Sequence, residues 1–209
     1  MSRACSRRAS IREKMVQPTL RRLSPKEYLS LERAATDKHE LVSGELFAMA
    51  GGSREHNLIA GNVVTELNQA LRARRCVVYP SDMKIKAASA STYHYPDASV
   101  VCGEERFEDD VRDVVLNPTL LVEVLSDSTE RYDRGDKFAS YQQIASFTDY
   151  LLLSSKQTRV EHFAREADGS WRLRAYGPGE RIPVVSLGVE LEVDELYRKV
   201  FDAPVAGGE

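Results

Sequence analysis

Two carboxylates, Asp97 and Glu123, lie within or next to apolar segments that are typical of buried strands. Glu123 interrupts the apolar run Leu120–Leu125, which is typical of a central strand covered on both faces. An ionised group buried there is costly unless it binds a metal, pairs with a cation or reaches water; the alternative is an edge strand with Glu123 in solvent. Asp97 follows Pro96 directly before a second strand-like run, and by itself it could be a plain turn residue.

A lysine shares the apolar face of a predicted helix. At about 100° per residue, Lys137 lies on the same face as Tyr141 and Ile144, so its ammonium is expected along the sheet surface. A lysine whose stem covers apolar surface while its head reaches water would give the same pattern. Two carboxylates could share Mg2+, which prefers oxygen ligands and acidifies a bound water, while an ammonium could orient that water or offset charge on a phosphate. Together the three residues indicate a metal-dependent phosphodiester hydrolase.

The same residues carry a family resemblance. The chain resembles the Uma-two (Uma2) family, described as "putative restriction endonucleases", a branch of the PD-(D/E)xK nuclease superfamily. The resemblance covers about residues 24 to 200. The motifs that carry it are Pro96-Asp97, Glu123-Val124-Leu125-Ser126, the segment 133–138 with Tyr141, the segment 40–46, His56 and the segment 149–151.

The resemblance implies a fold and a set of site residues. The implied fold is α/β (mixed α+β), with a restriction-endonuclease-like core, a mixed central sheet flanked by helices and additional β-hairpins. Asp97 and Glu123 are implied as catalytic metal ligands, with the main-chain oxygen of Val124 beside them. The superfamily lysine two positions after Glu123 is replaced by Leu125, so Lys137 on the next helix is expected to take the catalytic role of that lysine.

Four further side chains and one charge run have competing interpretations. His56, in the first turn of an expected helix, is a catalytic candidate that could touch a phosphate or the attacking water, or it could donate to a neighbouring carbonyl. Glu40 either faces the site or is an ordinary strand or turn carboxylate. We expect His94 and His162 to be structural or exposed, and the acidic segment 104–113 to be a solvated loop rather than a metal site.

The elements that must position these residues follow from periodicity and turn signals. Apolar residues at spacings of three and four predict a long helix from Ser53 to about Arg75, and the capping sequence 24–27 predicts a short helix before it. A hairpin is expected around Ser43-Gly44. The other predictions are strands at 76–86, 95–102 and 119–126, a helix at about 133–146, and strands at 149–154, 159–165, 171–176 and 181–187.

Chain length and charge bear on domain organisation. The 209 residues fit one domain, predicted over 23–200, between a flexible basic tail at 1–22 and a flexible tail at 201–209. Residues 1–22 hold seven basic residues and one acidic residue, a charge of +6, which leaves −9 for the remainder of a chain whose net charge is −3. The basic segment could touch nucleic acid phosphates, or it could be a solvated tail.

Cysteine usage and hydropathy bear on the compartment. Cys5, Cys76 and Cys102 are widely spaced and lack the short spacings of zinc ligands, so we expect free thiols in a reducing compartment and no structural zinc. No apolar run approaches the roughly 18 to 20 residues that a membrane-spanning helix needs. The sequence therefore predicts a soluble, cytoplasmic protein with no membrane partner.

Our leading interpretation is an endonuclease that hydrolyses DNA phosphodiester bonds with a water activated by Mg2+, or by Mn2+ in its place. A homodimer is expected, because cutting both strands of a duplex commonly uses two sites related by a twofold axis. The alternatives are a non-catalytic nucleic-acid-binding module on the same fold and an oligomeric assembly protein. Asp97 and Glu123 on opposite sides of the sheet would favour the assembly protein.

Overall fold

Strand β8 (Leu120–Leu125) is the centre of a computed structural model that describes residues 22–87 and 91–201. It lies between the antiparallel β6 (Ala98–Cys102) and the parallel β9 (Asp149–Ser154), in a six-stranded sheet of order β11-β10-β9-β8-β6-β3. All six residues of β8 are buried. The prediction of a central strand is therefore confirmed, and the alternative of an edge strand with a solvated carboxylate is wrong.

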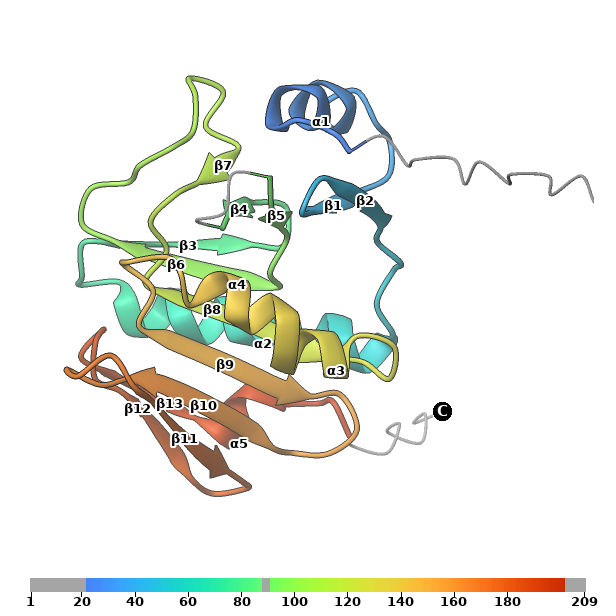
Figure 1. The fold of residues 1–209 in the computed structure, drawn as a ribbon. Helices are drawn as coiled ribbons and strands as arrows, with labels where there is room; N and C mark the ends of the chain where they lie inside the picture. Colours follow the sequence, from blue (N-terminus) through green and yellow to red (C-terminus); the bar gives the residue numbers. More distant parts are fainter. Residues whose placement is uncertain (1–21, 88–90, 202–209) are drawn as a thin grey trace, which may run out of the picture.

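Two further sheets complete the mixed α+β arrangement (Figure 1). The second sheet has five strands in the order β2-β1-β5-β4-β7, and the third is a C-terminal hairpin of β12 and β13. The first sheet is completed by β3 (Cys76–Pro80), β10 (Val160–Arg165) and β11 (Trp171–Tyr176). The other two contain β1 (His39–Val42), β2 (Glu45–Ala48), β4 (Lys84–Lys86), β5 (Tyr93–His94), β7 (Val114–Val115), β12 (Arg181–Val184) and β13 (Val189–Glu192).

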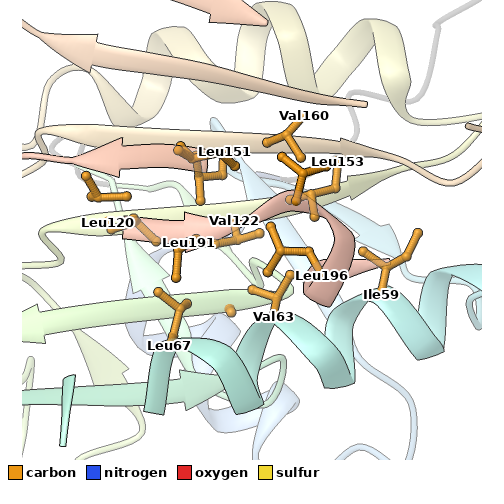
Figure 2. Close-up of a cluster of buried hydrophobic side chains, with 14 of the residues drawn as sticks. Ile59, Val63, Leu67, Leu120, Val122, Leu151, Leu153, Val160, Leu191 and Leu196 are labelled. Atoms are coloured by element: carbon orange, nitrogen blue, oxygen red, sulfur yellow. The ribbon is translucent and has the colours of Figure 1, made fainter. Parts of the chain in front are cut away.

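Helix α2 (Arg54–Leu71) supplies one side of the main core. Its N-cap Ser53 accepts a hydrogen bond from the third helical amide, as its position before the periodic segment predicts. Its buried side chains Ile59, Val63 and Leu67 pack against the apolar residues of β6, β8 and β9 (Figure 2). Residues of the C-terminal hairpin and of the short α5 (Val193–Leu196) close the same cluster.

A smaller helix covers the second sheet. Helix α1 (Pro25–Glu32) begins with a capping box between Ser24 and Glu27, as the sequence predicts. Its Tyr28 is fully buried beside Tyr93 of β5. The second sheet therefore has an apolar face toward α1, and its opposite face is free to carry polar groups toward the central sheet.

Three predicted elements have other boundaries in the structure. The strand expected over 76–86 turns after Pro80, so that β3 and β4 belong to different sheets. The strand expected over 95–102 starts only at Ala98, as β6, because Pro96 has no N–H for a ladder bond. The helix expected over 133–146 consists of α3 (Glu130–Tyr132), the π-helical turn η1 (Asp133–Lys137) and α4 (Phe138–Tyr141).

A disulfide joins the edge strand β3 to its neighbour β6 in the first sheet. Cys76 and Cys102 are directly opposed in the antiparallel register of β3 and β6, and they are bonded to each other. The expectation of free thiols is therefore wrong for these two residues, because strand pairing brings together cysteines that are 26 residues apart. Disulfides are rare in reducing compartments such as the cytoplasm. The cytoplasmic location therefore stays a prediction, and this disulfide argues against it. Cys5 lies outside the described residues.

The predicted tails lie almost entirely outside the described residues, and the domain boundaries at 23 and 200 stay a prediction. Within residues 22–87 and 91–201, no helix has the length and apolar character needed to cross a bilayer.

Replacement of Leu67 by alanine should lower the free energy of unfolding by about 2 to 5 kcal/mol, because it leaves a cavity between α2 and the central sheet. The side chain of Leu67 is fully buried, whereas Leu173 on β11 is 53% exposed. Urea titration followed by circular dichroism measures both substitutions. If Leu67→Ala lowers the free energy of unfolding no more than Leu173→Ala does, the packing of Leu67 against the central sheet is contradicted.

Candidate active site

Asp97 lies in the break between the two larger sheets. Ala98 pairs with Val122, and the N–H of Asp97 donates to the carbonyl of the same Val122 at 3.0 Å. Two successive residues thus oppose one, as in a β-bulge, a device that redirects a side chain. The carboxylate oxygen Oδ2 accepts from the N–H of Val124 at 2.7 Å and lies 3.2 Å from Nε2 of His56. The bulge therefore directs Asp97 toward the end of β8.

Glu123 points away from α2. Its neighbours Val122 and Val124 belong to the apolar cluster under that helix, so strand alternation directs Glu123 to the opposite face. Oxygen Oε1 accepts from Nζ of Lys137 at 2.8 Å and from the hydroxyl of Tyr141 at 3.0 Å. Burial raises the pKa of Glu123 well above its ordinary value, although the positive charge of Lys137 opposes this. The ion pair with Lys137 and the hydrogen bond from Tyr141 offset the cost of a carboxylate at this depth.

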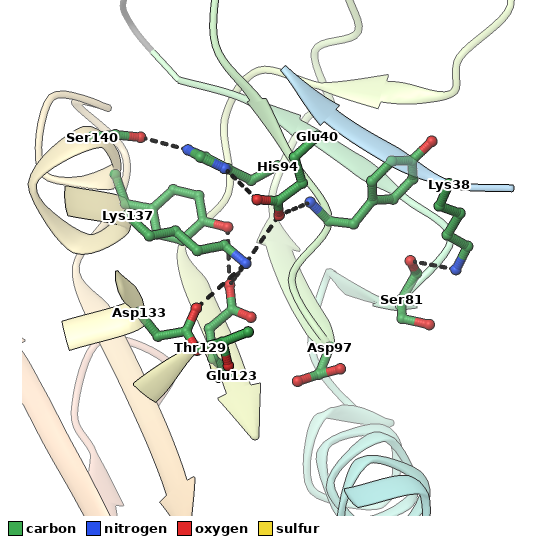
Figure 3. Close-up of polar contacts among 12 residues, drawn as sticks. Lys38, Glu40, Ser81, His94, Asp97, Glu123, Thr129, Asp133, Lys137 and Ser140 are labelled. Carbon is green, nitrogen blue, oxygen red and sulfur yellow. Dashed lines mark hydrogen bonds and ion pairs between the residues drawn. The ribbon is translucent and has the colours of Figure 1, made fainter. Parts of the chain in front are cut away.

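Lys137 is enclosed by carboxylates from three elements (Figure 3). Its Nζ lies 2.8 Å from Glu123 on β8, 3.1 Å from Glu40 on β1 and 3.7 Å from Asp133 on η1. The residue is only 4% exposed, so the alternative of a lysine reaching water is wrong. Burial disfavours the charged form, but the three carboxylates outweigh burial and raise the pKa of Lys137 well above its ordinary value. The side chain is therefore held as an ammonium.

Glu40 is held by polar groups on both oxygens. Oε1 accepts from Lys137 and from the N–H of Tyr95 at 3.1 Å, while Oε2 lies 3.2 Å from Nδ1 of His94. Burial alone would raise the pKa of Glu40, but the charge of Lys137 and the contact with His94 lower it to about 2. Of the two interpretations of Glu40, the structure favours the one in which it faces the site.

His94 is a member of this network that the sequence did not reveal. It is fully buried, and its Nε2 lies 2.9 Å from the hydroxyl of Ser140 on α4 while its Nδ1 contacts Glu40. Burial lowers the pKa of His94, which favours the neutral ring. The histidine thereby connects β5 with α4 behind the lysine. In the sequence, membership of His94 in the site was indicated only by its position three residues before Asp97, and proximity in sequence alone is weak evidence.

His56 lies beside Asp97 and not against a neighbouring carbonyl. The hydrogen bond that Nε2 of His56 donates to Asp97 raises the pKa of His56, against the effect of burial. A Cβ at Gly52 would come within 2.6 Å of Nδ1 of His56, so the ring occupies the space that a larger residue would need. Among the described residues Nδ1 is buried and has no hydrogen-bond partner.

Two other sequence interpretations concern charges away from this cluster. His162 is buried and lies 2.7 Å from Asp149, as expected of a structural histidine. The expectation of a solvated acidic loop is wrong in part, because Arg33, the C-cap residue of α1, binds both Asp109 and Asp113. These ion pairs attach the loop to α1, and we find no metal-ligating arrangement in this segment.

The oxygen atoms that the resemblance implies as metal ligands are of the chemical type that Mg2+ prefers. Within residues 22–87 and 91–201, no group of three or more His, Cys, Asp or Glu side chains is arranged to hold a metal. The implied set is smaller, with the carboxylates of Asp97 and Glu123 and the main-chain oxygen of Val124, and Mg2+ usually completes such a set with water. In Figure 3 the carboxylate of Glu123 is directed toward Lys137, whereas Asp97 is held by the N–H of Val124 and by His56 of α2. The negative charge of Asp97 contributes to the raised pKa of Glu123. A cation would relieve this repulsion.

Comparison with known proteins identifies the family of this chain. The family model Uma2, described as "Putative restriction endonuclease", matches residues 25–195. The chain belongs to the Uma2 family. It is 37% identical over 182 residues to "Uncharacterized protein slr1290" of Synechocystis, covering 85% of this chain and 92% of that protein. It is 36% identical over 159 residues to "Uncharacterized protein sll1609" of the same organism, covering 76% of this chain and 90% of that protein.

A solved structure supports the fold of this Uma2 protein. The structure of a "putative nuclease belonging to DUF820" from Anabaena variabilis superposes with a TM-score of 0.69 over 84% of this chain and 97% of that chain, at 15% sequence identity. The fold predicted from the resemblance, a mixed α+β restriction-endonuclease-like core, is therefore confirmed. The roles of the individual site residues stay predictions.

Removal of the Glu40 charge should lower stability in a pH-dependent way. Because the pKa of Glu40 falls from 4.5 to about 2 on folding, its charged form stabilises the native state fully above pH 4.5. This contribution is lost as the pH falls through about 2. Wild type should therefore exceed Glu40→Gln by on the order of 2 to 3 kcal/mol at pH 7, with the difference shrinking below pH 4.5.

Urea titration at a series of pH values measures that difference. Glu45→Gln is the matched control, because this carboxylate lies on the adjacent strand and its side chain is 47% exposed. A difference between wild type and Glu40→Gln that stays constant from pH 7 to pH 2 would contradict the ion pairing of Glu40.

Proposed function

We propose that this Uma2 protein is a Mg2+-dependent endonuclease that hydrolyses DNA phosphodiester bonds. The observation that carries the proposal is the buried Lys137 ammonium between Glu123 and Glu40, with Asp97 held just before β6 by the N–H of Val124, the residue after Glu123. A buried cluster of acidic and basic groups with shifted pKa values is typical of a catalytic site. The descriptions of the family and of the Anabaena protein as nucleases support this reaction class.

Three oxygen-bearing groups would bind the cation. Asp97, Glu123 and the main-chain oxygen of Val124 would hold Mg2+, or Mn2+ in its place, which when bound acidifies a water and stabilises charge on the phosphate. The N–H of Val124 fixes the carboxylate of Asp97, and the hydroxyl of Tyr141 fixes that of Glu123. These contacts orient both carboxylates before any cation arrives.

Lys137 would offset negative charge on the phosphate, and His56 would donate a proton. Because its pKa is raised, Lys137 stays protonated and would offset negative charge on the phosphate rather than remove a proton from water. His56, whose pKa is raised by Asp97, would present a proton near the same phosphate. Catalysis by these groups should therefore depend on the positive charge at position 137.

A second candidate function is a non-catalytic nucleic-acid-binding module. It is favoured by one observation, that Oε1 of Glu123 is already occupied by Lys137 and Tyr141. In that case the ion cluster would serve stability alone. The two candidates differ in whether the wild-type protein cleaves nucleic acid when a divalent cation is supplied.

Cleavage of plasmid, linear duplex and single-stranded DNA should occur with Mg2+ or Mn2+ and stop in EDTA. Asp97→Asn, Glu123→Gln and Lys137→Met should each reduce the rate at least about 100-fold, because each removes a cation ligand or the ammonium. Asp127→Asn is the matched control: this exposed carboxylate just beyond β8 pairs only with Lys156 among the described residues, so the rate should be unchanged.

Gel assays under single-turnover conditions measure these rates, and circular dichroism establishes that each variant is folded. Isothermal titration with Mg2+ separates loss of cation binding, expected for Asp97→Asn and Glu123→Gln, from loss of chemistry alone. A folded wild type that binds DNA without cleaving it under any of these conditions would favour the binding module.

We also propose a homodimer, because a duplex endonuclease commonly pairs two sites about a twofold axis. Size-exclusion chromatography with light scattering should give twice the chain mass of 23.4 kDa at micromolar concentration. A mass of one chain under these conditions would contradict the dimer.

A further inference from the structure

The hairpin of β1 and β2 has two different faces. Residues of β1 alternate, so that Leu41 packs against α1 in the apolar cluster of Tyr28 and Tyr93, while Glu40 points the opposite way, toward Lys137. In the antiparallel register Leu41 opposes Leu46 and Glu40 opposes Phe47. Because cross-strand partners share a face, Phe47 lies on the face of Glu40 and Leu46 on the face of α1.

The geometry of this hairpin is fixed at its turn. Ser43 and Gly44 both have positive φ, at 51° and 87°, as a two-residue hairpin turn requires. The N–H of Gly44 donates to the carbonyl of Ser91, and that of Ser43 to the hydroxyl of Thr92, which attaches the turn to the segment before β5. A one-residue slip, which would exchange the two faces, is therefore prevented.

Phe47 is exposed although it is large and apolar. It is 50% exposed, and Met49, two residues further on the same face, is 36% exposed. Neither side chain belongs to any of the three apolar clusters of the described residues. The fold does not need this apolar surface for packing, and the surface lies directly across the hairpin from a carboxylate that contacts Lys137.

We infer that Phe47, extended by Met49, is a stacking surface for an unpaired nucleobase next to the phosphate that is cleaved. The inference rests on the proposed function, and it specifies the substrate as nucleic acid with at least one unstacked base at the site. Phe47 is the cross-strand partner of Glu40, whose carboxylate contacts Lys137, so a nucleic acid strand bound at this cluster would pass beside its ring. An aromatic ring at that place offers the base a flat apolar contact that needs no sequence match.

Charge favours a base contact over a duplex held by its phosphates. The chain beyond residue 22 carries a net charge of −9, and the surroundings of Lys137 include Glu40, Glu123 and Asp133. Phosphate contacts to basic side chains are therefore a weak source of affinity on this body. In a duplex each base is stacked between its neighbours, which cover both of its faces. An exposed aromatic side chain can therefore stack only on an unpaired base.

The test is binding of fluorescein-labelled 20-nucleotide DNA at low salt in EDTA, followed by anisotropy. The probes are one single strand, its blunt duplex and an abasic strand that retains the phosphates. Phe47→Ala should weaken single-strand binding about 5-fold to 150-fold and leave duplex and abasic binding unchanged. Phe47→Trp should bind within about 2-fold of wild type, because indole also stacks. Leu46→Ala, on the same strand but the other face, should have no effect.

Three outcomes would overturn the inference. The first is equal weakening by Phe47→Ala and Leu46→Ala, the second is equal weakening on all three probes, and the third is no weakening at all. Cleavage assays on the same proteins keep the two proposals apart. Cleavage by wild type without any dependence of binding on Phe47 overturns this inference alone. Binding that depends on Phe47 without cleavage supports the contact between Phe47 and an unpaired base and overturns the proposed nuclease function.

Discussion

The ion cluster around Lys137 is the interaction on which the arrangement of the site depends. One ammonium satisfies carboxylates from β1, β8 and η1, three elements that are far apart in the sequence and belong to different layers. Each of these charges would be strongly unfavourable at its depth without the others. The second sheet and the central sheet therefore have to meet at this place, and the lysine fixes how Glu40 and Glu123 are positioned relative to each other.

Local sequence patterns were sufficient for several of the elements and for one member of the site. Glu123 is conspicuous because it interrupts an apolar strand, and α2 follows from the spacing of its buried residues. The capping box of α1 and the turn at Ser43-Gly44 each depend on neighbouring residues, so they too could be predicted. The assignment of Asp97 and Lys137 to the same site needed the family resemblance in addition.

Contacts between distant segments could not be predicted in this way. The bond between Cys76 and Cys102 depends on the register of β3 and β6, and the burial of His94 depends on α4 lying over β5. The π-helical turn also escaped prediction, because its residues have the same apolar spacing as an ordinary helix. In that turn the carboxylate oxygen Oδ1 of Asp133 and Nζ of Lys137 lie 3.7 Å apart. The irregular segment therefore contributes both a carboxylate and the ammonium of the cluster.

The site draws its groups from two sheets, and this has a consequence for partial opening of the molecule. Asp97 and Glu123 are positioned by β6 and β8, whereas Glu40 and His94 belong to the second sheet. If the second sheet and α1 detach while the central sheet stays intact, both presumed cation ligands remain in register, but the lysine loses one of its counterions. Such a locally unfolded species would retain metal affinity without the arrangement needed for turnover, and the two properties would then differ in their resistance to heat or denaturant.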